Sequence, residues 1–561
     1  MNNFTFYSFI PVPKRAVCFL LFLAFILFVQ TVQAQSPTVL WAEQFGSTSN
    51  DSGSYVVVDS QGDIYTTGTF SGTVTFGNTT LTSSLDNEAY VLKTDASGTV
   101  LWAEQFGNVD ITVDKSGNIY TTGQFTDTVT FGSFTLTAQG DYDYFMVKYD
   151  TSGTVLWANQ FTGTTSSITF RRIAIDTTGN VYVTGFFNSI SDFAGIELTP
   201  YPSTLPDVFV VKLDASGTVQ WAEQFERTDN DGTSLSFLGI YTDMSDDVYV
   251  LGHMMSMGGA TTLVFGDTTL SLSNTSNFGG EVFLVKLNPD GTLLWANQYG
   301  QGSGNNIPYG GLAFDEEDNI YFGGFTNGTV TFGDTTLTST MSSNIYVVKT
   351  DGEGTVLWAT KFGESYEYNR VNTIRRDAVG AIYLIGYFSQ TANFGSTVLS
   401  TVGGNDVFVA KMNNSGVLEW ATGFGSTEND SGNSIAVDTQ GDAYIAGSFW
   451  GTVNFGNTTL TSAGSRDAFL MKIGSTLAVS EFVDNHWKVY PNPAKDIITI
   501  ELPKDIQNST IEVFNTLGQK VKEFTMFANI QNFDIAELQQ GVYLFRISNN
   551  GMNKTLKVYK Q

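Results

Sequence analysis

A phrase built around tryptophan returns along this chain at intervals of 55 to 74 residues. The first copy reads Trp41-Ala42-Glu43-Gln44-Phe45-Gly46, and every later copy also begins with a Trp-Ala pair. The tryptophans of the seven copies are Trp41, Trp102, Trp157, Trp221, Trp295, Trp358 and Trp420. A tandem period of this size means that one supersecondary unit is copied along the chain. This repeat constrains the fold more than any other feature of the sequence.

Each copy reads as a set of short antiparallel strands. In the first copy, β-branched and aromatic runs at residues 54–58, 64–70 and 89–93 are separated by Asp-x-x-Gly turns at 59–62 and 95–98. Runs of this length bounded by turn residues are typical of strands, and no window of about ten residues shows helical periodicity. The run at 74–82 predicts an extra hairpin between the second and third strands of the repeat.

Two charged residues return with the repeat. The aspartate of the first turn is predicted to form an Asx turn, and two copies replace the turn glycine by Asp246 and Asp318. One lysine ends a hydrophobic strand in each copy, and we predict that it is an edge or outer-face charge that prevents strand aggregation. These lysines are Lys93, Lys148, Lys212, Lys286, Lys349, Lys411 and Lys472.

The lysine strands and the tryptophan strands are out of phase at the chain ends. Trp41 has no lysine strand before it, and Lys472 has no tryptophan strand after it. We therefore predict that residues 37–41 pair with 469–472, which removes two open sheet edges. The predicted fold is all-β: a seven-bladed β-propeller closed by its N-terminal strand. The tryptophans, equivalent in every copy, are predicted to be largely buried between blades.

The repeat resembles the SBBP, or β-propeller repeat, family. The resemblance rests on the patterns Asp-x-x-Gly-x-Ile/Val-Tyr-x-x-Gly and Asp-x-Phe-x-x-Lys-x-x-x-x-Gly-x-x-x-Trp-Ala, and it covers about residues 36–474. It implies a propeller fold and no particular activity.

The N-terminal segment 1–34 is predicted to be a secretory signal peptide. Lys14 and Arg15 precede an apolar run at 16–29, and Val32-Gln33-Ala34 ends in small residues that suit a signal peptidase. The run is too short for a transmembrane span. The only cysteine, Cys18, lies inside it. The mature chain is therefore predicted to have no membrane span, no disulfide and no thiolate metal site.

The C-terminal segment 488–561 is a different unit, reached through a predicted linker at 475–487. It contains Tyr490-Pro491-Asn492-Pro493, then a Val-Phe-Asn-Thr-Leu-Gly-Gln run at 513–519 and a Gly-Val-Tyr-Leu run at 541–544. In this order the motifs resemble the type A C-terminal sorting domain of the Bacteroidota type IX secretion system. The resemblance implies a small Ig-like β-sandwich, contact with the secretion machinery, and export to the cell surface or beyond. An ordinary fibronectin-like module is the alternative.

Charge separates the two units and excludes some partners. The chain has a net charge of −28, and residues 35–483 hold 16 basic and 47 acidic side chains. Binding to nucleic acid or to anionic lipid depends on Lys and Arg. The repeat region is therefore predicted to bind neither.

Few residues suggest a chemical site, and no catalytic or cofactor-binding residue is predicted. Asp229 and Asp231 resemble the front of a calcium loop that lacks the distal glutamate of an EF-hand, so calcium is left open as a cofactor there. His253 stands among methionines at 254, 255 and 257, which suits either copper or a loop in which methionine replaces packed phenylalanine.

Two arginine pairs, Arg171-Arg172 and Arg375-Arg376, fall in different registers of their repeats and are predicted to be solvated loop or strand-edge charges. The predicted function is a non-enzymatic scaffold that binds a glycan or a protein through one face or the central channel. The rival is a polysaccharide hydrolase or lyase, which a cluster of Asp or Glu, Tyr and Arg at a channel mouth would favour. A mouth of Gly, Ser and Thr would favour binding.

Overall fold

The computed structural model describes residues 37–83, 87–106, 109–114, 116–163, 168–200, 206–227, 234–255, 262–272, 280–302, 306–307, 310–339, 343–365, 369–474, 488–502, 509–515, 519–549 and 552–561. All regular elements in these ranges are β-strands. Within them no helix has the length and apolar character needed to cross a membrane. The chain divides into two compact units, Met1–Ser475 and Thr476–Gln561.

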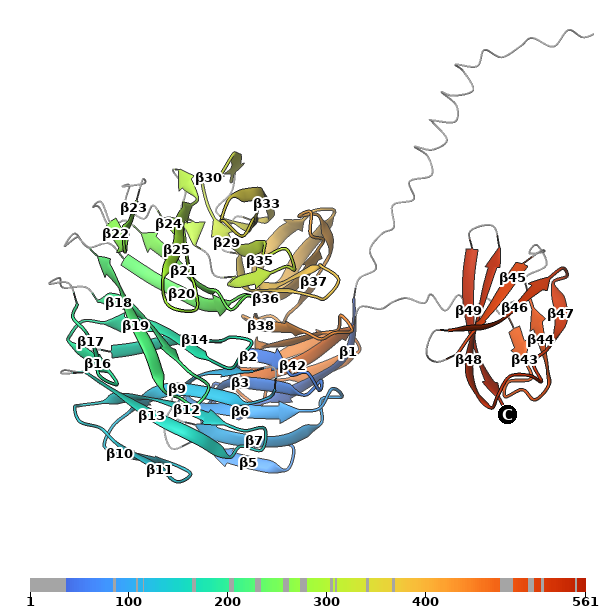
Figure 1. Ribbon diagram of the computed structural model, residues 1–561, viewed down its shortest axis with the longest axis horizontal. Coiled ribbons are helices and arrows are strands. Elements are labelled where there is room, and N and C mark those ends of the chain that lie inside the picture. Colours follow the sequence, from blue (N-terminus) through green and yellow to red (C-terminus); the bar gives the residue numbers. More distant parts are fainter. Residues whose placement is uncertain are drawn as a thin grey trace, which may run out of the picture. The chain divides into compact units, whose positions relative to one another are not determined.

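The first unit is built from antiparallel groups of four strands that follow one another along the chain (Figure 1). In order from the innermost strand outward, the groups are β2 (Ser52–Val58), β3 (Ile64–Phe70), β6 (Glu88–Thr94) and β7 (Val100–Phe106); β8 (Val109–Val113), β9 (Ile119–Phe125), β12 (Asp143–Tyr149) and β13 (Val155–Gly163); β14 (Ile168–Ile175), β15 (Val181–Phe187), β18 (Asp207–Leu213) and β19 (Val219–Arg227); β20 (Ser234–Thr242), β21 (Val248–Met255), β24 (Gly280–Leu287) and β25 (Leu293–Tyr299); β28 (Leu312–Phe314), β29 (Ile320–Thr326), β32 (Ser343–Thr350) and β33 (Val356–Ser365); β34 (Arg370–Arg376), β35 (Ile382–Phe394), β36 (Thr397–Met412) and β37 (Leu418–Phe424).

A short hairpin lies between the second and third strands of most groups, as the sequence predicts. These hairpins are β4 (Thr73–Phe76) with β5 (Thr79–Thr82), β10 (Thr128–Phe131) with β11 (Phe134–Thr137), β16 (Ser191–Phe193) with β17 (Ile196–Leu198), β22 (Thr262–Phe265) with β23 (Thr268–Ser271), β30 (Thr329–Phe332) with β31 (Thr335–Thr338), and β40 (Thr452–Phe455) with β41 (Thr458–Thr461). In one group the hairpin is continuous with β35 and β36. The short strands β26 (Gln301–Gly302) and β27 (Asn306–Ile307) pair with β30 and β29. The hairpins also pack inward, because Val74 and Phe76 are fully buried.

The last group of the first unit joins the two ends of the repeat region. Here β1 (Thr38–Phe45) pairs with β42 (Asp467–Gly474), which in turn pairs with β39 (Ala443–Phe449) and then β38 (Ser431–Val437). The register places Trp41 opposite Lys472. The predicted pairing of 37–41 with 469–472 is therefore present from Thr38 onward. It also buries apolar side chains of β1, since Ala42 and Phe45 are 5% and 6% exposed.

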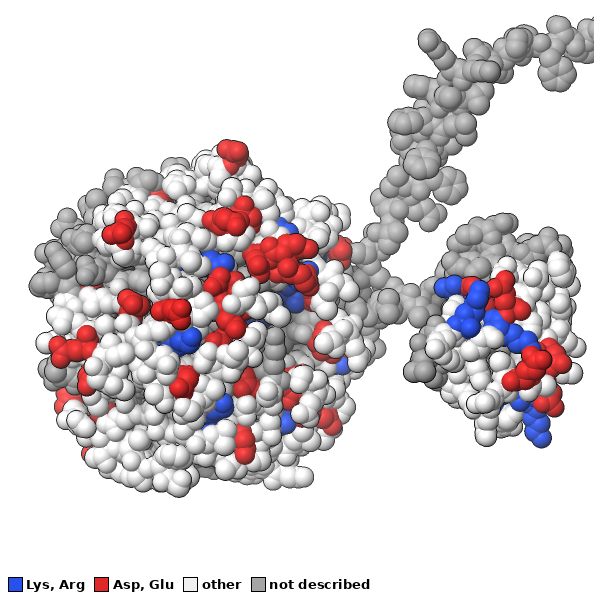
Figure 2. Space-filling model, in the orientation of Figure 1, with Lys and Arg blue, Asp and Glu red and all other residues white. Residues whose placement is uncertain are grey.

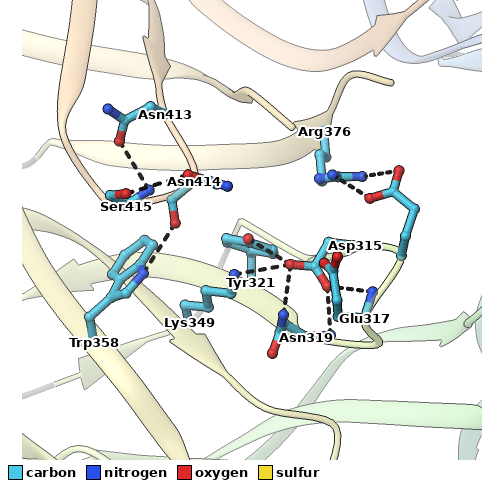
Figure 3. Close-up of polar contacts among 11 residues, drawn as sticks. Asp315, Glu317, Asn319, Tyr321, Lys349, Trp358, Arg376, Asn413, Asn414 and Ser415 are labelled. Atoms are coloured by element: carbon cyan, nitrogen blue, oxygen red, sulfur yellow. Dashed lines mark hydrogen bonds and ion pairs between the residues drawn. The ribbon is translucent and has the colours of Figure 1, made fainter. Parts of the chain in front are cut away.

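The turn aspartate is an Asx-turn residue, as predicted, and it also binds a tyrosine. In one copy the Asp315 carboxylate accepts hydrogen bonds from the backbone N–H of Asn319 at 2.8 Å and from the Tyr321 hydroxyl at 2.9 Å. Figure 3 shows these contacts together. Asp246 and Asp318, which replace the turn glycine, adopt positive φ values of 66° and 59°. Aspartate tolerates this left-handed conformation better than most residues, so the turn survives the exchange.

The prediction that the repeat lysine is an edge charge is wrong. It lies on the third strand, between two others, and its ammonium group is largely covered. Lys349 pairs with Asp315 at 3.0 Å and lies over the Tyr321 ring at 4.8 Å from the centroid (Figure 3). The same lysine-over-tyrosine contact recurs for Lys93, Lys148, Lys212, Lys286, Lys411 and Lys472. The lysine therefore ties the third strand to the turn instead of guarding an edge.

The tryptophans join neighbouring groups, as predicted, but most are half-buried instead of largely buried. Only Trp157 falls in the buried class, at 9% exposed. The indole Nε1 of Trp221 donates to the carbonyl of Pro289 at 3.1 Å, and that of Trp358 to Asn414 at 3.3 Å. Each acceptor belongs to the turn before the outer strand of the next group. An outer-strand side chain is covered by that turn on one side only, which leaves part of the indole exposed.

The second unit consists of two antiparallel sheets. One contains β43 (Lys488–Tyr490), β44 (Ile497–Glu501) and β47 (Ile530–Asp534); the other contains β46 (Lys520–Met526), β45 (Ser509–Phe514), β48 (Gly541–Asn549) and β49 (Met552–Lys560). Ile498 and Ile500 from the first sheet and Ile511, Val513 and Phe545 from the second belong to one buried cluster. The two sheets therefore share a core.

Replacing Phe45 by alanine is expected to destabilise the repeat region by about 3–5 kcal/mol, the usual cost of truncating a buried aromatic side chain. Leu40→Ala on the same strand is the control, because Leu40 is 51% exposed. Its cost should stay within about 0.5 kcal/mol.

Deletion of 35–42 should cost several kcal/mol, because it bares an edge and apolar surface. Chemical denaturation measures all three, and an unchanged stability of the deletion would contradict the role given to β1.

Asp315→Asn is expected to remove an acid-sensitive contribution to stability. Burial raises the pKa of Asp315, but hydrogen bonds from Asn319 and Lys349 outweigh this effect and lower the pKa from 3.8 to about 2. As the pH falls, the unfolded chain therefore takes up the proton first, so the stabilisation is complete above about pH 4 and is lost as the pH falls through about 2.

The free energy of unfolding of wild type and Asp315→Asn should be measured between pH 2 and 6. Above about pH 4 the wild type should be more stable by about 1–3 kcal/mol, the range for a buried charged acceptor, and the difference should shrink toward pH 2. Asp334→Asn, an exposed residue in a hairpin turn, is the control. A difference that stays constant over this range would contradict the assignment.

Candidate functional site

The innermost strands surround a cavity of about 820 Å³. Every group contributes to its wall through β2, β8, β14, β20, β28, β34 or β38. A smaller cavity of about 330 Å³ shares Ser54, Tyr55, Ile111 and Arg172 with it. The residues of the larger cavity's wall include Ser54, Tyr55, Val57, Thr112, Arg172, Ala174, Tyr241, Ala313, Arg370, Arg375, Arg376, Tyr387, Asn433 and Ser434.

One position of the repeat supplies a ring of these residues. It is the residue two places before the turn aspartate, and it pairs across the sheet with the repeat tyrosine. Its members are Val57, Thr112, Ala174, Tyr241, Ala313, Arg375 and Ala436. All except Ala436 line the cavity. Small side chains at most of these positions leave room in which Tyr241 and Arg375 can extend.

Arg375 has no carboxylate partner among the described residues. Its guanidinium donates to the carbonyl of Ile374 at 2.8 Å. Burial lowers the pKa of Arg375, while the nearby Tyr241 and Tyr55 side chains act in the opposite direction. These two tyrosines come from different strands, β20 and β2. A half-buried cation therefore lines the same cavity as two phenol groups.

The other arginines of the wall are held by local contacts. The Arg172 guanidinium lies over the Tyr55 ring at 5.2 Å from the centroid. Arg376 makes a bidentate ion pair with Glu316, at 2.9 and 2.6 Å (Figure 3). Arg370 begins β34 and lines the same cavity.

Arg172 and Arg375 lie on β14 and β34, which are edge strands of their sheets, in agreement with the strand-edge prediction. They are not solvated loop charges, because both are half-buried in the wall of the cavity. Their registers do differ, since Arg172 lies opposite Thr184 and Arg375 lies opposite Tyr383. However, both positions face the same cavity, one layer apart. Counting back from the turn aspartate would have located them, because Arg172 is four residues before Asp176 and Arg375 is two before Asp377.

The cavity wall and the outer surface of the first unit differ in the charge of their side chains. Figure 2 shows many more acidic than basic side chains on one face of the first unit. Among the described residues that line the larger cavity there is no Asp, Glu or His. Hydroxyl and amide side chains, four arginines and three tyrosines supply its polar groups. The cavity is therefore suited to hydrogen bonding and to anions, and the described wall offers no carboxylate for acid–base chemistry.

The structure describes only part of the segments that contain the metal candidates. Asp229 and Asp231 lie outside the described residues. His253 is 4% exposed on β21, and burial lowers its pKa to about 4. Met254 packs in a core cluster, as the packing interpretation of this segment predicts, whereas Met257 lies outside the described ranges. Across the parts of the chain that are described, no three His, Cys, Asp or Glu side chains are grouped so that they could hold a metal ion.

Two known families match parts of the chain. Residues 488–561 match the secretion system C-terminal sorting domain, and residues 156–192 and 419–452 match the β-propeller repeat. An uncharacterized WD repeat-containing protein of Acanthamoeba polyphaga mimivirus is 25% identical over 457 residues. That match covers 65% of this chain, and the chain spans about a third (32%) of the relative's length.

Among solved structures, a protein of unknown function from Dyadobacter fermentans aligns over 78% of this chain and 98% of its own, with 8% identity and a TM-score of 0.36. An ulvan lyase of a polysaccharide lyase family aligns over 76% and 97%, with 10% identity and a TM-score of 0.37. The intramolecular trans-sialidase of Ruminococcus gnavus aligns over 75% and 95%, with 8% identity and a TM-score of 0.33.

The family matches agree with the repeated four-stranded groups of the first unit and with the separate second unit. They also set the destination of the protein, since a sorting domain of this kind directs export to the cell surface or the extracellular space. The chain is a secreted protein of SBBP-type β-propeller repeats that ends in the C-terminal sorting domain of the type IX secretion system.

Proposed function

We propose that this protein is a non-enzymatic binding scaffold of the cell surface and that its ligand enters the central cavity. The observation that carries the proposal is the cavity of about 820 Å³, whose described wall combines tyrosine, arginine and short polar side chains without a carboxylate. Ligand pockets typically measure about 300–1,000 Å³ and carry a few convergent polar groups on a pre-formed frame. The frame here is the set of innermost strands.

We also propose that residues 35–474 form a seven-bladed propeller closed by β1, linked by 475–487 to an Ig-like sandwich at 488–561. Seven copies of the repeat in the sequence support the blade number. Ring closure is supported by the β1–β42 pairing and by hydrogen bonds between β2 and β38. There the Asn433 side chain donates to the Gly53 carbonyl at 2.7 Å, and the Val56 N–H donates to the Ser434 hydroxyl at 3.2 Å.

Binding in the cavity predicts that filling it abolishes recognition. Ser54 is half-buried and lines both cavities, so Ser54→Trp should remove the signals that the purified protein gives on a glycan array. Thr75→Trp, at an exposed position of hairpin strand β4, is the matched control and should bind like the wild type.

Two results would contradict this assignment. Undiminished binding by Ser54→Trp would place the site outside the cavity. Release of reducing ends or of unsaturated products from the bound glycans would favour the rival hydrolase or lyase. A hydrolysis screen on the same glycans tests this second outcome.

The second unit is proposed to serve export without joining in binding. Removal of 488–561 should leave a folded repeat region in the periplasm, and fusion of this segment to an unrelated signal-bearing protein should carry that protein to the surface. Phe545→Asp, at a fully buried core position, should block export, whereas Phe527→Asp, at a position 68% exposed, should not. Surface labelling of whole cells distinguishes these outcomes. If the truncated protein still reaches the exterior, residues 488–561 are not the export signal.

A further inference from the structure

The cavity places a cation where the fold does not compensate it. Arg375 extends from β34 into the ring of residues two places before the turn aspartates. In the same ring, Val57, Thr112, Ala174 and Ala313 also line the cavity. None of these four side chains carries a negative charge that could pair with the guanidinium group of Arg375. The remaining member that lines the cavity, Tyr241, supplies a phenol group.

The chain as a whole would make a counter-ion easy to supply. Residues 35–483 hold 47 acidic side chains. Most repeat lysines pair with an aspartate in or beside a turn, as Lys349 does with Asp315 at 3.0 Å. Arg376, next to Arg375, is paired with Glu316. Arg375 alone of this adjacent pair has no carboxylate within ion-pair distance among the described residues. Arg375 is half-buried in the cavity wall, so its guanidinium is available to an anion that enters the cavity from outside.

The surrounding wall favours a sugar as the carrier of that anion. Ser54 and Thr112 offer hydroxyl groups that make no hydrogen bond to other described residues. Tyr55, Tyr241 and Tyr387 place aromatic rings and phenol groups in the wall from three different strands. Aromatic faces combined with scattered hydrogen-bonding groups match the alternation of C–H faces and hydroxyl groups on a saccharide.

We propose that the channel binds an acidic saccharide and that Arg375 holds the carboxylate or sulfate group of one sugar, with Tyr55 and Tyr241 beside it. This inference rests on the proposed binding function of the cavity and specifies its ligand class. A guanidinium presents two parallel N–H donors that match a planar carboxylate or two sulfate oxygens. Arg172, stacked on Tyr55, lies one layer away and adds positive charge along the path of the chain.

The test is calorimetric titration of the purified full-length protein with three tetrasaccharides. Hyaluronan tetrasaccharide carries carboxylates only, κ-carrageenan tetrasaccharide carries sulfates only, and neoagarotetraose is a neutral counterpart of the second. At least one acidic probe should bind, and the neutral probe should bind about tenfold more weakly or not at all, as expected when a charge-assisted hydrogen bond is lost. The stronger acidic probe identifies the anion as carboxylate or sulfate.

Arg375→Gln should weaken binding of the acidic probe by about tenfold or more and leave binding of the neutral probe unchanged. Arg375→Lys keeps the charge but loses the paired donors, and should fall between the two. Lys361→Gln removes the same charge on the outer strand β33, where Lys361 pairs with Glu364 at 3.7 Å, and should bind like the wild type. Melting temperatures of the variants confirm that each is folded.

Three results would overturn the inference. Equal binding of acidic and neutral probes, or unchanged binding by Arg375→Gln, would show that the cavity does not select an anion, while the proposed binding function would stand. Binding of an octaglutamate peptide with loss in Arg375→Gln, and of no saccharide, would assign the site to acidic peptides. If neither acidic tetrasaccharide binds, the saccharide assignment is wrong, and the array with Ser54→Trp then decides the proposed function separately.

Discussion

The antiparallel pairing of β1 with β42 is the interaction on which the rest of the repeat region depends. It joins strands more than 400 residues apart, with Thr38 opposite Gly474. Without it, the group of β38, β39 and β42 would lack its outer strand, and β42 would present an open edge. It also gathers Ala42, Ile445, Phe469 and Met471 into one core cluster. The hydrogen bonds between β2 and β38 then hold the inner wall together at the same junction. The shape of the central cavity therefore depends on the pairing of β1 with β42, which lies at the outer side of the group.

The strands, the turns and the pairing of the chain ends could be predicted because they are encoded in local, repeated patterns. Asp-x-x-Gly with alternating β-branched residues is sufficient to locate a turn, and the phase difference between Trp41 and Lys472 is sufficient to pair the ends. The role of the repeat lysine could not be predicted in this way. Its position at the end of a strand is visible in the sequence, but its partner is not, because Asp315 reaches Lys349 only after β28, β29 and β32 have paired. The sequence predicts correctly that the tryptophans lie between groups, but it does not predict how exposed they are. The exposed fraction of each indole depends on how far the next turn extends over an outer strand.

The residues of the candidate site could be predicted only in part from the sequence, because strand pairing and not the repeat pattern brings them together. Arg172 and Arg375 fall at different positions of the motif, and comparing motif positions alone separates them. In the fold, successive residues on one side of an innermost strand face the cavity in layers, so side chains two positions apart reach the same space. A register counted from the turn aspartate predicts this arrangement, whereas a comparison of neighbouring residue types does not. The anion-binding character proposed for the cavity also cannot be seen in the overall charge of −28, because it depends on a few half-buried arginines in the wall.

Residues that recur in every copy and residues that vary between copies therefore have different roles, the first in stability and the second in the cavity wall. The turn aspartate, the tyrosine, the lysine and the tryptophan hold strands and neighbouring groups together, and the lysine-over-tyrosine contact recurs in all seven copies. A residue that is identical in all copies gives every group the same surface, so it cannot by itself create one distinct site. The position two before the turn aspartate is free of these contacts and carries valine, threonine, alanine, tyrosine or arginine. Variable positions of this kind let a repeated frame present an asymmetric wall, and Tyr241 and Arg375 are the two largest polar side chains at this one. Specificity in a repeat protein of this kind is expected where the copies disagree.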